Sequence, residues 1–175
     1  MRSRILIVAL VLVSFSAAAL AKMPPGRFGF GLQGLTITTG AATMPTLQFY
    51  LNDKVKEEIG VSYATRTPSG GVSINTGTVA LALKVMLEPI DNIIPHWGIG
   101  LQYTSNPALV SGAGLLAVSL NFGAEVFIYP NLSIEGNISP LTYSSFSAAG
   151  VTNNTISVFD SSIVPAVVFG MHYYL

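Results

Sequence analysis

Apolar residues recur at every second position in eight separate stretches of this chain. In the last stretch, Phe169, Met171 and Tyr173 alternate with Gly170 and His172. A period of two places the two sets on opposite faces of a β-strand. The pattern therefore predicts an all-β protein whose strands each have one apolar and one polar face, and we expect no charged side chain on the apolar faces. The eight stretches are 26–38, 44–52, 55–65, 78–88, 96–103, 116–126, 132–138 and 162–175.

The connections between these stretches alternate in length. Those after the second, fourth and sixth stretches are short, whereas the sequence predicts longer loops at 66–77, 104–112 and 140–161. An even number of strands with short periplasmic turns and long external loops is typical of bacterial outer-membrane barrels. We therefore expect the three long loops on the external side and both chain ends on the periplasmic side.

The polarity of the two faces indicates which one points outward. In lipid every backbone N–H and C=O group must be paired, and a sheet achieves this only by closing into a barrel. The sequence thus predicts an eight-stranded antiparallel up-and-down transmembrane β-barrel with apolar residues toward lipid. The alternative is a soluble barrel or β-sandwich, whose apolar residues would point inward. Pro165 lies at a position of the apolar face and has no backbone N–H to donate to a neighbouring strand, so we expect a bulge there.

Aromatic residues near the strand ends favour the membrane interpretation. Outer-membrane barrels have aromatic girdles at both lipid–water interfaces, although aromatic residues are also good strand formers. The predicted girdle consists of Phe28, Trp97, Tyr129 and Tyr173 toward the periplasm and of Tyr63 and Tyr103 toward the outside.

Charged residues on the polar faces are expected to form one layer in the lumen. Counting from the predicted turns places Glu58, Lys84, Glu125 and Glu135 at similar depth, roughly 10 Å from the periplasmic mouth at about 3.3 Å per residue. Arg27, His96 and His172 are expected at or below this layer. We favour a salt-bridge cluster that fills the interior, because eight strands leave an interior just wide enough for side chains. The alternative is a charged constriction that gates small solutes.

The N-terminus has the order of a cleavable secretory signal over residues 1–21. Arg2 and Arg4 precede an apolar run that closes with Ala19-Leu20-Ala21, and an uncleaved anchor helix is the alternative. The barrel domain would then be 22–175. Without the two arginines the chain has six basic and eight acidic residues, which makes nucleic acid an unexpected partner. The absence of cysteine excludes disulfides and cysteine-ligated metals.

Residues 122–136, FGAEVFIYPNLSIEG, resemble the strand–turn–strand sequences of the small bacterial outer-membrane β-barrel superfamily, which includes the OmpA membrane domain, OmpX and OmpW. The resemblance covers 26–175. It implies location in the bacterial outer membrane and insertion by the outer-membrane assembly machinery, which reads a C-terminal strand ending in an aromatic residue. This chain has Tyr173 near its end but finishes with Leu175.

The function expected from these features is a structural, porin-like barrel with a largely filled polar lumen, acting as a monomer among outer-membrane lipids. The alternatives are a barrel that binds an adhesion partner or ligand through loops 66–77, 104–112 and 140–161, and a small-solute channel gated by the charged layer. We expect neither catalysis nor a cofactor. The sequence also predicts no metal site, because His96 and His172 stand in isolation, without ligand spacing.

Overall fold

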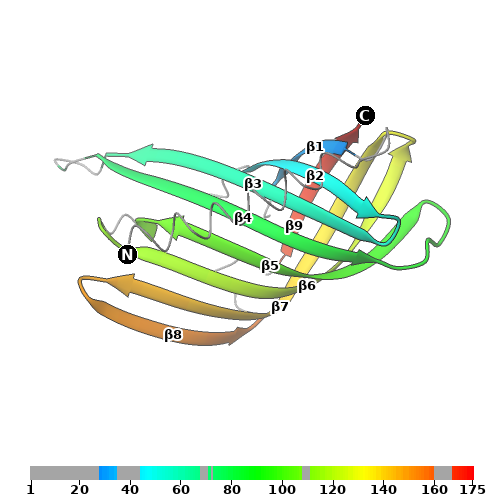
Figure 1. Cartoon of the computed structure of the whole chain (residues 1–175). Helices are drawn as coiled ribbons and strands as arrows, with labels where there is room; N and C mark the ends of the chain where they lie inside the picture. The colour runs from blue at the N-terminus through cyan, green and yellow to red at the C-terminus, as the bar shows by residue number, and fades with distance from the viewer. Residues whose placement is uncertain (1–27, 35–43, 68–70, 72, 108–110, 160–166) are drawn as a thin grey trace.

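A computed structural model describes residues 28–34, 44–67, 71, 73–107, 111–159 and 167–175. These residues form nine antiparallel strands (Figure 1). The strands are β1 (Phe28–Gln33), β2 (Met44–Asn52), β3 (Val55–Arg66), β4 (Ile74–Met86), β5 (Ile93–Ser105), β6 (Gly114–Tyr129), β7 (Leu132–Ala148), β8 (Val151–Val158) and β9 (Val167–Tyr174).

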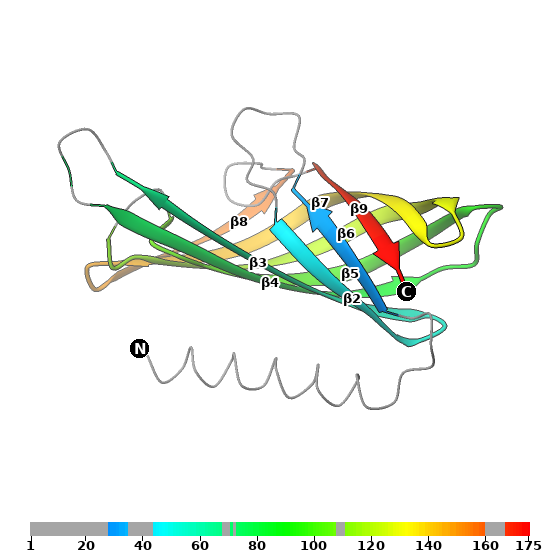
Figure 2. The ribbon, with the colours of Figure 1, turned by 90° about the horizontal axis from the view of Figure 1, so that it is seen from above.

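Eight of the nine strands close into a ring. Strands β1 to β7 pair in sequence order, β7 pairs with β9, and β9 pairs with β1 (Figure 2). The predicted eight-stranded antiparallel barrel is therefore confirmed. The turns after β2, β4 and β6 lie at the same end as Leu175, which we name the short-turn end; the opposite end is the hairpin end. Within the described residues, no helix is long and apolar enough to span a membrane.

Strand β7 changes partner halfway along its length. Its first half, up to Ile138, pairs with β9, and its second half, from Leu141, pairs with β8. The predicted loop at 140–161 is therefore wrong over most of its length, because residues 140–158 form a hairpin with a tight turn at Ala149-Gly150. Both turn residues have positive φ, 48° and 82°, which suits a two-residue connection.

A β-bulge at Ser139-Pro140 lies at the change of partner. Leu120 pairs with Leu141, whereas Phe122 pairs with Ile138, so β7 carries one extra residue there. The extra residue reverses the alternation of faces. Inward positions are odd before the bulge and even after it. The buried residues are Ser133, Glu135, Asn137 and Ser139 on one side, and Thr142 and Ser144 on the other.

The other two long connections are shorter than predicted. Strand β4 begins at Ile74 and β5 continues to Ser105, so the ladder extends into both 66–77 and 104–112. Strands β6 and β7 have 16 and 17 residues, more than the roughly 9–11 that cross a bilayer. The hairpin end of the barrel therefore projects beyond the length needed for a membrane span.

The outward and inward faces have the predicted polarity. Ile99 and Phe169 are exposed outside, whereas Glu58, Lys84 and Glu125 are buried inside. Glu57 is an exception to the expected charge-free outer face, because it lies on the outward parity between Phe49 and Leu83 of the neighbouring strands. It follows the turn at Asp53-Lys54 closely, and an acidic residue near the end of a membrane strand costs less than one at its centre.

Three expectations lie outside the described residues. They are the signal peptide at 1–21, the position of Arg27 in the lumen and the bulge at Pro165.

The face reversal at the bulge can be tested by spin labelling, because the chain has no native cysteine. Labels at Leu141→Cys and Tyr143→Cys should be accessible to oxygen in detergent micelles, as should a control label at Ile138→Cys. A label at Thr142→Cys should be immobile and shielded. Equal shielding of positions 141 and 143, with position 142 accessible, would show that β7 alternates without interruption.

Candidate functional site

The charged side chains of the interior come from five strands of the ring. Lys56 and Glu58 lie on β3, Lys84 on β4, Glu125 on β6, Glu135 on β7 and His172 on β9. We name these six residues the ion cluster. Each of them is no more than 3% exposed, and the parity of its strand points it inward. The cluster lies near the short-turn end, since Lys56 closely follows the turn at 53–54.

Neighbouring strands place like charges opposite each other in this cluster. Lys56 is the register partner of Lys84, and Glu125 is the register partner of Glu135. Such cross-strand pairs are unfavourable by themselves. Most of their neutralisation comes from across the lumen, because β3 and β4 are not neighbours of β6 or β7 in the ring. In addition, Lys84 pairs with Glu58 of the neighbouring β3.

Lys56 joins the two facing carboxylates. Its Nζ lies 2.8 Å from Glu125 Oε2 and 2.9 Å from Glu135 Oε2. Lys84 makes an equivalent bridge between Glu58 Oε2, at 2.8 Å, and Glu135 Oε1. Glu135 therefore binds both ammonium groups and links the two sides of the barrel. Charge-assisted hydrogen bonds of this kind are stronger than neutral ones.

Neutral polar groups donate further hydrogen bonds to the carboxylates. Glu125 Oε1 accepts hydrogen bonds from Ser133 Oγ and the Tyr174 hydroxyl, and the Gln48 amide donates to Glu58. Asn137 Nδ2 donates to Glu135, and Asn137 Oδ1 lies 2.7 Å from His96 Nε2. Buried charges persist when they are both paired and hydrogen-bonded, and this network supplies both conditions.

His172 is the exception in this network. It is 1% exposed, and neither ring nitrogen has a hydrogen-bond partner. Carboxylate oxygens surround it: Nε2 lies 3.9 Å from Glu58, and Nδ1 lies 3.8 Å from Glu125 and 3.7 Å from Glu135.

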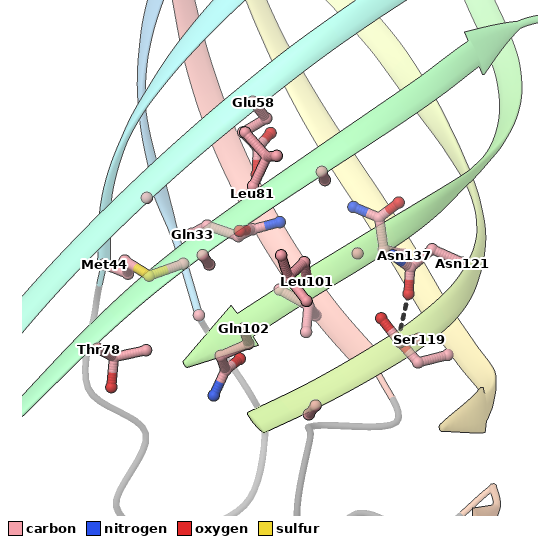
Figure 3. A pocket seen from close by; sticks show the side chains of 18 of the residues that line it. Gln33, Met44, Glu58, Thr78, Leu81, Leu101, Gln102, Ser119, Asn121 and Asn137 are labelled. Carbon is pink, nitrogen blue, oxygen red and sulfur yellow. Dashed lines mark hydrogen bonds between the residues drawn. The ribbon is translucent and has the colours of Figure 1, made fainter. Parts of the chain in front are cut away.

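A cavity of about 250 Å³ adjoins the ion cluster on its hairpin-end side (Figure 3). Glu58, Lys84 and Asn137 form its boundary with the cluster. The other inward residues along it are uncharged: Gln33, Met44, Gly60, Ser62, Thr78, Ala80, Ala82, Gly100, Gln102, Ala117, Ser119, Asn121, Ser139 and Val168. The interior thus consists of an open half lined by uncharged, mostly small side chains and a half filled by the ion cluster.

The structure brings together the four residues predicted for the charged layer, which are Glu58, Lys84, Glu125 and Glu135, and both histidines expected at or below it. Arg27 lies outside the described residues. Sequence analysis missed Lys56 and Tyr174 as members of the network. Parity could have identified both, since Lys56 shares the inward parity of Glu58, and Tyr174 shares that of His172.

The proposed girdle residues lie on the outer surface. Tyr63 and Tyr129 are 70% and 63% exposed, and Trp97 and Tyr173 are also exposed. Phe28 and Tyr103 are half-buried. Asn131 donates a hydrogen bond of 2.7 Å to the Tyr173 hydroxyl at the short-turn end, which gives this amphipathic ring a polar contact at its tip.

Comparison with known proteins gives a match at the level of fold. No family model and no curated protein sequence matches this chain. The solution structure of the E. coli outer membrane protein W superposes with a TM-score of 0.53 at 12% identity, covering 88% of this chain and 100% of that one. The chain has the fold of a small outer-membrane β-barrel.

Two further structures superpose with lower scores. A de novo designed transmembrane β-barrel has a TM-score of 0.49 at 12% identity, covering 88% of this chain and 99% of the design. The outer membrane protein AlkL has a TM-score of 0.45 at 11% identity, covering 88% of this chain and 92% of that one.

The contribution of the ion cluster to stability can be measured with two lysines that are two residues apart. Lys56→Met should lower the free energy of unfolding by about 3–5 kcal/mol, because it leaves Glu125 and Glu135 buried with one ammonium fewer. Lys54→Met should have no measurable effect, since Lys54 pairs with Glu88 at 3.8 Å on the exposed surface. Urea unfolding followed by the fluorescence of the single tryptophan, Trp97, provides the measurement. Equal effects of the two variants would contradict this account of the cluster.

Proposed function

We propose that this chain is a structural protein of the bacterial outer membrane, whose barrel lies among lipids and whose interior is closed by the ion cluster. The observation that carries the proposal is the inverted polarity of the fold. Lys56 and Glu135 are fully buried inside the ring, whereas Ile99, Val61 and Phe122 lie outside and are 54%, 53% and 43% exposed.

This distribution suits lipid better than water as the surrounding solvent. A soluble barrel of eight strands fills its interior with apolar side chains, and a large exposed apolar surface in water favours aggregation. Here the outward residues form an apolar band around the ring, while polar residues fill the interior. We infer export by the N-terminal signal, insertion by the assembly machinery and a monomeric, non-enzymatic state as parts of the same proposal.

The packing of the lumen favours a closed barrel over a pore. The cavity of about 250 Å³ ends at Glu58 and Lys84, and beyond them the side chains of the cluster contact one another across the ring. A solute entering from the hairpin end would therefore meet a layer of paired charges.

Binding at the projecting hairpin end is a second candidate function. Strands β6 and β7 exceed the length of a membrane span, so they and β8 would present surface outside the lipid. Val151 and Ile156 of β8 are 60% and 72% exposed there, and exposed apolar side chains on a rigid scaffold are suited to contact a partner.

Planar-bilayer recording separates a closed barrel from a channel. The wild-type barrel should give no steady conductance. Lys84→Ala should produce brief or steady openings, because it removes the side chain that links Glu58 to Glu135, and Gln102→Ala, at the cavity wall, should stay silent. Steady wild-type conductance would contradict the closed barrel.

Membrane location can be tested by expressing the full chain in a bacterium and separating its inner and outer membranes. The barrel should fractionate with the outer membrane, and deletion of residues 1–21 should leave it in the cytoplasm. Recovery of the full-length protein in the soluble periplasm would contradict the membrane assignment, whatever the conductance experiments show.

A further inference from the structure

His172 lies in a buried environment that its present contacts do not explain. Both ring nitrogens are buried and have no hydrogen-bond partner. The groups facing it are acceptors when ionised, since Glu58, Glu125 and Glu135 surround it. An imidazole nitrogen buried without a partner is costly, so the arrangement indicates that something else binds there.

The distances around His172 suit donor atoms that bind a common metal ion better than atoms joined by a hydrogen bond. N–H···O bonds have donor–acceptor distances of about 2.7–3.2 Å, whereas the nitrogens of His172 lie 3.7–3.9 Å from the carboxylate oxygens. Two ligands of a tetrahedral metal ion with bonds of about 2.1 Å are about 3.4 Å apart. One donor atom from each of Glu58, Glu135 and His172 lies within 4.8 Å of the others, so small shifts would bring all three to a common ion.

Two glycines leave room for the imidazole ring in this position. A Cβ atom on Gly31 would lie 2.0 Å from His172 Cδ2, and one on Gly170 would lie 3.1 Å from His172 Nε2. The hydroxyl of Thr46 is also buried without a partner and lies 2.7 Å from the same Gly31 Cβ position. A second unpartnered polar group therefore lies on the Gly31 side of the ring.

The charges of the cluster leave one negative charge unbalanced when all three carboxylates are ionised. Three carboxylates face two ammonium groups, Lys56 and Lys84. A divalent ion would change the sum from −1 to +1, so the total charge does not oppose binding. The local repulsion comes from Lys84, which binds both Glu58 and Glu135, and from Lys56, which binds Glu135.

We propose that Glu58, Glu135 and His172 bind one divalent transition-metal ion inside the barrel, in partial competition with Lys84. Two carboxylates and one imidazole match the ligands of Zn²⁺, with a water molecule in the fourth position. The sequence did not predict this site, because its ligands come from β3, β7 and β9 and are far apart along the chain.

Equilibrium dialysis of the folded, untagged chain against zinc chloride tests the site, after treatment with a chelator and with bound metal counted by mass spectrometry. The wild type should bind one Zn²⁺ per barrel, and His172→Gln should weaken binding by at least about 100-fold, since even outer partners of metal ligands contribute 10–100-fold. Gln102→Ala is the control, because Gln102 lines the adjoining cavity and donates to Thr104 but is not one of the three ligands. It should bind zinc as the wild type does.

Two further variants keep the test decisive. Glu58→Gln should lose zinc in the same way as His172→Gln, and it replaces that variant if the latter fails to fold. Lys84→Met should bind zinc more tightly than the wild type, because it removes the cation that binds two of the three ligands. The proposal is overturned if the wild type binds no zinc at millimolar concentration, if Glu58→Gln and His172→Gln bind as the wild type does, or if Gln102→Ala loses zinc equally.

Discussion

This barrel depends on ion pairs across the lumen, which neutralise the like charges that neighbouring strands place side by side. The register of neighbouring strands places Lys56 beside Lys84 and Glu125 beside Glu135, so each local hairpin brings together charges that repel. Lys84 also pairs with Glu58 of the neighbouring β3. Glu125 and Glu135 meet their ammonium partners only when the β3–β4 and β6–β7 hairpins face each other across a closed ring. The same closure pairs the backbone groups that lipid would leave unsatisfied. Side-chain electrostatics and backbone hydrogen bonding therefore both require the complete ring, which gives a physical basis for cooperative folding.

The bulge in β7 lies where this strand changes its partner from β9 to β8. Pro140 cannot donate a ladder hydrogen bond, and a bulge is a position where proline is tolerated within a sheet. Its carbonyl still accepts a hydrogen bond of 3.0 Å from Phe159 N. The extra residue turns Leu141 and Tyr143 outward. The outer face of β7 therefore stays apolar, and its inner face polar, past the change of partner.

The sequence predicted the barrel and most of its ion cluster because both depend on alternation, which is a local property. It failed at 140–161 for the same reason: the bulge reverses the parity, and a strand whose pattern changes phase has the appearance of a loop. The expectation of a charge-free outer face was wrong at Glu57, although parity alone could have placed this residue there, since it lies two residues before Ile59 on the same strand. The contacts of His172 with Glu58 and Glu135 were beyond the sequence, since they depend on which strands face each other across the ring.

The limited width of an eight-stranded ring explains why the cluster fills the interior instead of lining a channel. Such a ring encloses space just wide enough for side chains, and large residues fit only opposite small ones. Gly31 and Gly170 lie against His172, and a Cβ on Gly123 would lie 2.4 Å from Asn137 Oδ1 and 2.7 Å from His96 Nε2. These glycines face the crowded half of the lumen. Beyond Glu58 and Lys84, Met44 packs against Gly60, but most inward residues are small, and the space that they leave unfilled becomes the cavity. The distribution of large and small inward residues therefore decides where the barrel is closed.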